Sequence, residues 1–337
     1  MTTSETVPVA KSSTTGTTSV DNRWGLQRAS TYRIAGVLSA LVAVFVIFTL
    51  LEPAFVEVGN LGEIVVQSSI IAVVALGMTL VIVSGGIDLS VGSIVGLVSV
   101  VCAMNLSTWG TPLTIVIGFA LGGALGLMNG FFSAYLDLQS FIVTLATLNL
   151  FRGFAFLYTG GSPTFGLESS FRTVFAGSLL GIQNPIILLL VTTAACWLLL
   201  NNTRLGTYLR AVGSNVDAAR KSGVRIKRTQ MLAFVLCGVL CALAALMLMA
   251  RVGAAEPITG SGFELTAIAA VVVGGTSLNG GRASIVGTIL GAILLGSIRT
   301  GLTLLNVNGY VQYVVTGAII LIAVLVDRYV TRKRDAR

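Results

Sequence analysis

The residues best suited to bind a partner lie in one polar segment, 202–228, of a chain that is otherwise largely apolar. Its basic side chains are Arg204, Arg210, Arg220, Lys221, Arg225, Lys227 and Arg228. Within it, the run Asp217-Ala218-Ala219-Arg220-Lys221-Ser222-Gly223 can form a short helix, capped by Ser214 or Asn215 and ended by Gly223 in a left-handed turn. We expect one or two helical turns that form a compact docking knob. The alanines allow close approach, and the surrounding positive charge favours an acidic or helix-terminal partner surface.

Two glycine-rich segments could expose backbone groups at membrane depth. They are 77–92, which contains Gly85 and Gly86, and 273–281, which contains Gly274, Gly275, Gly280 and Gly281. Glycine can break a helix, and exposed N–H and C=O groups within a bilayer require a protein interior or water. Ser-Ile-Val-Gly follows each segment, at 93–96 and 284–287, which suggests a structural repeat. Close helix packing is the alternative role for these glycines.

Three ionisable residues fall in or beside apolar stretches. A charge at the bilayer centre costs about 2.5–3.5 kcal/mol, so Asp88 should be paired, capped or wet. It could cap the helix that follows or contact a substrate, and capping is favoured. Arg152 is expected to bind a helix-terminal carbonyl or to pair with Glu264, and Arg299 is expected to extend toward the membrane surface.

The elements that must position these residues are membrane helices. The chain has 337 residues, of which 55% are hydrophobic and 10% charged, with a mean hydropathy of +0.92. A soluble domain needs about 25% charged residues, so the bilayer is the solvent. We predict an all-α integral membrane protein with about ten spans, near 34–51, 62–83, 89–106, 112–136, 139–158, 184–201, 229–250, 264–277, 283–305 and 309–327. The span at 264–277 is short, which predicts a broken or re-entrant segment.

The distribution of basic residues predicts the orientation. With ten spans, the segment 202–228 and both termini share one side, while the other side holds only Arg172 and Arg251. Both termini are therefore expected in the cytoplasm. We predict a disordered cytoplasmic tail at 1–30, a membrane domain at 31–328 and a basic cytoplasmic tail at 329–337. The net charge of +8 thus reports orientation and gives no reason to expect nucleic acid.

Several chemistries are excluded or disfavoured by composition. The chain has no histidine, and all four cysteines lie in apolar runs, so a zinc or haem site is not expected. It has no G-x-x-x-x-G-K-[ST] motif to hold ATP phosphates and no nucleophile elbow. We expect a protein that is not an enzyme and binds no cofactor of its own.

The acidic-Ala-Ala-x-x-x-Gly run resembles the coupling loop of ABC importer permeases. The segments 77–92 and 273–281, Asn129-Gly130, 141–147 and Arg152-Gly153 resemble signature stretches of the monosaccharide-type permeases, the ribose, xylose, galactose and arabinose group. The resemblance covers about 35–328, and Arg282, where many relatives carry a polar-glycine step, is one departure from it.

The resemblance implies a multi-pass permease subunit of the bacterial inner membrane that translocates a monosaccharide or related polyol. Its implied partners are a second permease copy, a cytoplasmic ATPase that carries ATP and Mg, an extracytoplasmic sugar-binding protein and membrane lipid. The candidate pathway or hinge residues are Ser84, Gly85, Gly86, Asp88, Ser90, Asn129, Thr144, Thr147, Asn149, Arg152, Gly274, Gly275, Ser277, Asn279, Gly280 and Gly281.

Three alternatives stay open. A branched-chain amino-acid ABC permease shares the general plan. An ion-coupled secondary carrier would have only Asp88 and Glu264 as coupling sites. A scaffold without transport activity would have no need for the paired glycine-rich breaks.

Overall fold

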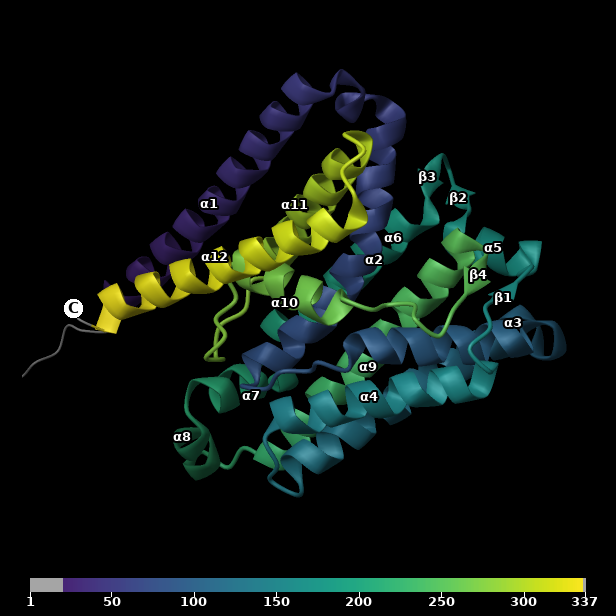
Figure 1. The fold of residues 1–337 in the computed structure, drawn as a ribbon. Helices are drawn as coiled ribbons and strands as arrows, with labels where there is room; N and C mark the ends of the chain where they lie inside the picture. The colour runs from purple at the N-terminus through teal and green to yellow at the C-terminus, as the bar shows by residue number, and fades with distance from the viewer. Residues whose placement is uncertain (1–20, 336–337) are drawn as a thin grey trace, which may run out of the picture.

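The computed structural model describes residues 21–335 and is mainly helical (Figure 1). The helices, in chain order, are α1 (Asp21–Leu51), η1 (Pro53–Val56), α2 (Val58–Val83), α3 (Val91–Ala134), α4 (Ser140–Thr159), α5 (Ser169–Ala176), α6 (Asn184–Asn202), α7 (Arg204–Ser214), α8 (Val216–Lys221), α9 (Ile226–Val252), α10 (Phe263–Val273), α11 (Ile285–Leu304) and α12 (Gly309–Asp335).

Two short antiparallel strand pairs join the loops at the end of the molecule away from α8 (Figure 1). In one, β1 (Thr164–Phe165) pairs with β4 (Ala254–Ala255), with Thr164 opposite Ala255. In the other, β2 (Ser178–Leu179) and β3 (Ile182–Gln183) form a hairpin. The segment between α4 and α6 contains β1, α5 and the β2–β3 hairpin. The pairing of β1 with β4 joins this segment to the residues that follow α9.

Helix length and composition agree with a membrane protein. Within the described residues, seven helices are long and apolar enough to cross a bilayer. One of them, α3, has 44 residues and contains Gly110 at φ 68°, which separates the two spans predicted at 89–106 and 112–136. The short helix expected near 264–277 is α10, of 11 residues, and it ends where the second glycine-rich segment begins.

The second half of α3 packs against α9 through glycines spaced four residues apart. A Cβ placed on Gly126 or Gly130 would overlap backbone of Phe234 or Met231 on α9, and one on Gly122 would overlap Gly238. Four-residue spacing puts such glycines on one helix face, so the two backbones meet directly. The four-residue period of these glycines is also visible in the sequence.

The predicted tails differ from the structure at both ends. Helix α1 begins at Asp21, so residues 21–30 of the expected disordered tail are helical, and residues 1–20 lie outside the described part. Helix α12 continues to Asp335, through most of the expected tail at 329–337. The charged residues there did not end the helix, because neither proline nor glycine occurs among them.

Candidate functional site

The polar segment 202–228 contains more helix than its sequence first indicated. Besides the expected short helix, residues 204–214 form α7, which Thr203 caps by accepting the N–H of Gly206 at 3.2 Å. Leu209 and Val212 are fully buried, and Leu205 packs against the hydrophobic core that contains Leu209. Positions 205, 209 and 212 have helical spacing, so this amphipathic pattern could have revealed α7.

The expected docking knob is α8, and its capping follows the prediction. The Asn215 side chain accepts the N–H of Ala218 at 2.9 Å, and Gly223 adopts φ 80° beyond the helix end. Asp217 and Arg220 form an ion pair at 3.1 Å with both side chains exposed. Ala219 faces inward, with 4% of its surface exposed. The helix therefore presents Asp217, Arg220 and Lys221 outward on a backbone held at both ends.

The two glycine-rich segments meet each other and the end of α7. Gly281 donates its N–H to the carbonyl of Val83, the last residue of α2, at 2.9 Å. A Cβ on Gly213 of α7 would overlap the Val83 carbonyl and lie 2.5 Å from the Gly281 nitrogen. A Cβ on Gly280 would lie 2.9 Å from the Gly213 carbonyl oxygen. We call Val83, Gly213, Gly280 and Gly281 the glycine junction.

One member of the glycine junction, Gly213, lies just before α8 in the chain. Only Ser214 and Asn215 separate Gly213 from the first residue of α8. Gly280 and Gly281 have φ of 82° and 74°, a conformation that side chains disfavour, so glycine is needed there for both shape and space. Gly213 has ordinary helical geometry and is needed for space alone. Gly213, just before α8, is therefore in direct backbone contact with the end of α2 and with the loop between α10 and α11.

A second group of predicted residues forms a buried polar chain. Asp88 Oδ1 accepts the N–H of Ser90 at 2.9 Å and its hydroxyl at 2.6 Å. Asn129 donates its amide N–H to Ser90 Oγ at 2.7 Å, and Thr147 donates to Asn129 Oδ1 at 2.8 Å. Ser90 is the N-cap residue of α3, so Asp88 does not cap the helix itself but forms the turn before it. The chain joins the start of α3, its second half and α4.

Asp88 is fully buried, and its Oδ2 atom has no hydrogen-bond partner among the described residues. The segment around it is also held by α4: Ile87 donates its N–H to Ser140 Oγ at 3.1 Å, and Thr144 donates to the Ile87 carbonyl at 3.2 Å. The first glycine-rich segment is thus fixed to α4 on one side and to α7 on the other.

Arg152 binds carbonyls of a loop, where a helix-terminal carbonyl and Glu264 were its two expected partners. Its guanidinium donates to the carbonyls of Pro257 and Thr259 at 2.5 and 2.7 Å, in the loop that leads to α10. Glu264, the alternative partner, accepts the N–H of Gly262 at 3.2 Å. Arg152 therefore ties α4 to an irregular segment whose carbonyls would otherwise need another donor.

The remaining candidates are not gathered into either group. Asn149 is exposed and donates to the Leu145 carbonyl of its own helix at 3.2 Å. Ser277 accepts the Gly280 N–H through its carbonyl, and Asn279 is exposed. The other members lie at the helix ends: Ser84 and Gly85 after α2, Gly86 against Phe234, and Gly274 and Gly275 after α10.

The two copies of Ser-Ile-Val-Gly, at 93–96 and 284–287, do not take equivalent positions at the starts of their helices. Ser284 is the N-cap residue of α11, and its Oγ accepts the Gly287 N–H at 3.1 Å. Ser93 lies inside the first turn of α3, after the cap at Ser90. The repeated Ser-Ile-Val-Gly therefore begins two helices at different positions, and the two segments still lie side by side at Val83 and Gly281.

No group of histidine, cysteine, aspartate and glutamate residues in the described part could hold a metal ion. Cys102, Cys196, Cys237 and Cys241 are free and buried.

We expect Asn129→Leu to destabilise the protein by about 2 kcal/mol. The change leaves Ser90 and Thr147 without their buried partner, and an unmade buried hydrogen bond costs about 1–3 kcal/mol. Asn149→Leu is the matched control, because Asn149 is exposed and donates its hydrogen bond to Leu145 of its own helix; its expected cost is below about 0.5 kcal/mol. Unfolding in mixed micelles measures both. Equal losses in the two variants would show that the buried chain does not stabilise the fold.

The apolar helices and the polar segments between them define a multi-pass membrane protein. The chain belongs to the family described as branched-chain amino acid transport system / permease component, whose model matches residues 60–324.

Relatives with curated names support a narrower grouping. The chain is 42% identical to the ribose import permease protein of Escherichia coli strain K12 over 295 residues, which covers 86% of this chain and 92% of that protein. It is also 42% identical to the ribose import permease protein of Bacillus subtilis strain 168, over 87% and 92% of the two chains. The galactose/methyl galactoside import permease protein of Escherichia coli is 36% identical, over 88% and 95%. The resemblance to the monosaccharide-type permeases is thus confirmed. No solved structure matches the chain significantly.

Proposed function

We propose that this chain is the membrane subunit of an ABC importer that moves a monosaccharide or related polyol across the bacterial inner membrane. The observation that carries the proposal is the 42% identity to ribose import permeases over 92% of their length. The capped helix α8, with Asp217, Ala218, Ala219 and Gly223 in the order of a coupling loop, is an independent structural argument.

The proposed topology has ten crossings with both termini in the cytoplasm. It counts α1, α2, the two halves of α3, α4, α6, α9, α10, α11 and α12 as the crossings. The segment 202–228 then lies on the cytoplasmic side with both tails, and α5 and the strand pairs lie outside. The excess of Arg and Lys on the cytoplasmic side supports this orientation.

In the proposed mechanism, separate cytoplasmic ATPase subunits with ATP and Mg dock on α8 of each of two permease copies. A solute-binding protein delivers the sugar from outside. Closure of the ATPase pair moves α8, and the glycine junction transmits the movement to the end of α2 and to the loop between α10 and α11. The pathway then changes from one open side to the other, a population shift driven by ATP.

Uptake into proteoliposomes tests the function. The chain is reconstituted with the ATPase and solute-binding protein found beside it, and uptake of ribose, xylose, galactose and leucine is measured with and without ATP. We expect ATP-dependent uptake of a sugar and none of leucine. Uptake of leucine instead would favour a branched-chain amino-acid permease. Transport that persists without the ATPase and follows a proton or sodium gradient would favour a secondary carrier.

A further inference from the structure

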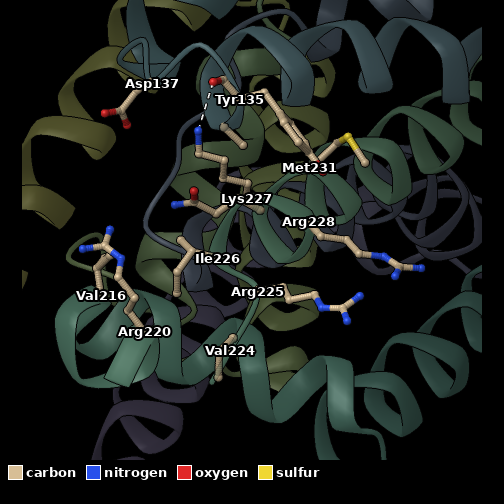
Figure 2. A pocket seen from close by; sticks show the side chains of 12 residues that line it. Tyr135, Asp137, Val216, Arg220, Val224, Arg225, Ile226, Lys227, Arg228 and Met231 are labelled. Atoms are coloured by element: carbon tan, nitrogen blue, oxygen red, sulfur yellow. Dashed lines mark hydrogen bonds between the residues drawn. The ribbon is translucent and has the colours of Figure 1, made fainter. Parts of the chain in front are cut away.

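A groove of about 850 Å³ lies between the end of α3 and the start of α9 (Figure 2). Its charged side chains are Arg220, Arg225, Lys227, Arg228 and Asp137, so it carries four positive charges and one negative charge. The coupling role assigned to α8 uses Arg220 but leaves the opposite end of the groove, around Arg225 and Arg228, without a function.

Arg225 and Arg228 are exposed, and within residues 21–335 neither guanidinium has a hydrogen-bond or ion-pair partner. Figure 2 shows both side chains extending in the same direction, while Asp137 and Arg220 lie at the other end of the groove. Two free guanidiniums that point the same way suit a phosphate group, because each can donate two parallel N–H bonds to its oxygens.

The position of the pair relative to the membrane decides which phosphate it suits. Helix α9 begins at Ile226, and its apolar run starts only at Met231, so Arg225 directly precedes the helix and Arg228 lies in its polar first turn. At this depth the side chains lie at the level of lipid headgroups, where each basic residue contributes about 1 kcal/mol to binding of anionic lipid.

An exposed apolar stripe on α3 continues from the groove along the helix. Leu127, Phe131 and Tyr135 are 45%, 46% and 41% exposed and follow each other at four-residue spacing. The Phe131 and Tyr135 rings stack, with centroids 5.8 Å apart. Tyr135 also borders the groove, and its carbonyl accepts a hydrogen bond from Lys227 at 3.2 Å. The stripe thus ends at the charged groove.

We propose that the groove and this stripe together bind an anionic phospholipid, with its phosphate on Arg225 and Arg228 and an acyl chain along Leu127, Phe131 and Tyr135. Charge complementarity accounts for the headgroup, and an exposed apolar face continuous with the groove accounts for the chain. The glycine contacts that bring α3 against α9 hold the two halves of the site together. The proposal requires only that the chain is embedded in a membrane, so it does not depend on the transported substrate.

Native mass spectrometry of the purified full-length chain, without its partners, tests the site. Phosphatidylglycerol and phosphatidylcholine with identical acyl chains are titrated onto the detergent-solubilised protein. We expect Arg225→Gln with Arg228→Gln to weaken phosphatidylglycerol binding about tenfold or more and phosphatidylcholine binding much less, because the choline cation already offsets the charge of its phosphate. Arg225→Lys with Arg228→Lys should retain most of the binding and shows that the fold tolerates changes here. Phe131→Ala should weaken both lipids about equally.

Arg204→Gln with Lys221→Gln is the matched control, because it removes the same charge from exposed positions outside the groove. Unchanged lipid binding in this control supports the proposal. Equal loss in both double variants would mean a nonspecific surface effect and would overturn it. Displacement of the lipid by glycerol 3-phosphate at equal concentration would reveal a site for soluble anions. Full lipid binding by the Arg225→Gln, Arg228→Gln variant, together with loss of ATPase co-purification in a separate assay, would assign the groove to the ATPase and overturn the proposal.

Discussion

Gly213→Ala is expected to reduce ATP-driven uptake at least tenfold, although alanine favours helices by about 1 kcal/mol over glycine. The new Cβ would overlap the Val83 carbonyl and lie 2.5 Å from the Gly281 nitrogen. Both are backbone atoms that cannot rotate away, so the hydrogen bond between them must open or α7 must move outward. Either change separates α8 from the glycine-rich segments. ATPase binding should remain, because the outer surface of α8 is untouched.

Gly153→Ala is the matched control for this variant. Gly153 is also helical, and a Cβ there meets nothing within 4 Å. Its uptake should stay within about twofold of the unchanged protein, since most surface changes cost below about 0.5 kcal/mol. Uptake and ATPase co-purification are measured for both variants. Normal uptake by Gly213→Ala would show that the close contact does not transmit movement.

Arg220→Glu combined with Lys221→Glu is expected to weaken ATPase binding at least tenfold, or about 1.4 kcal/mol, and to abolish uptake. Both residues lie on α8, the proposed docking helix, and Arg220 is 68% exposed there. The exposed ion pair with Asp217 contributes at most about 1 kcal/mol, so membrane insertion and folding should survive its loss. Co-purification with the ATPase and size-exclusion chromatography of the permease separate these effects. Normal assembly of this variant would remove α8 from the docking surface.

Gly223→Val tests the docking role of α8 by straining its backbone without changing its charge. Gly223 has φ 80°, which costs other residues about 1–2 kcal/mol, and a β-branched side chain is among the least tolerant. Nothing lies within 4 Å of its Cβ position, so any loss comes from backbone strain at the end of α8 and not from a clash. We expect reduced ATPase binding without a change of charge, and unaltered binding would show that the turn does not matter.

Much of the fold followed from hydropathy because membrane helices must satisfy their backbone internally. Each predicted span overlaps a helix, including the short α10. The prediction for 202–228 lacked α7. This helix is amphipathic, and its basic residues make the segment read as a polar loop despite the buried positions Leu209 and Val212. The limits of α1 and α12 were also misplaced, since composition alone does not end a helix.

The sequence indicates which residue types form the candidate site, but only partly which of these residues lie close together in the fold. The caps of α8 are local interactions, so Asn215 and Gly223 were predictable from a few neighbouring residues. The contact of Gly213 with Val83 and Gly281 joins three parts of the chain, and no local pattern marks Gly213. Asn129 and Asn149 look alike in the sequence, yet one is buried in a polar chain and the other is exposed.

The glycine face of α3 limits which movements the protein can make. At Gly122, Gly126 and Gly130 the backbone of α9 fills the space that a side chain would need, so sliding α3 along α9 would bring residues with side chains into contacts that only glycine fits. The two helices should therefore move as one rigid body. Conformational change must then occur where this pair contacts the other helices. Spin labels placed on its two helices would keep a constant separation throughout turnover.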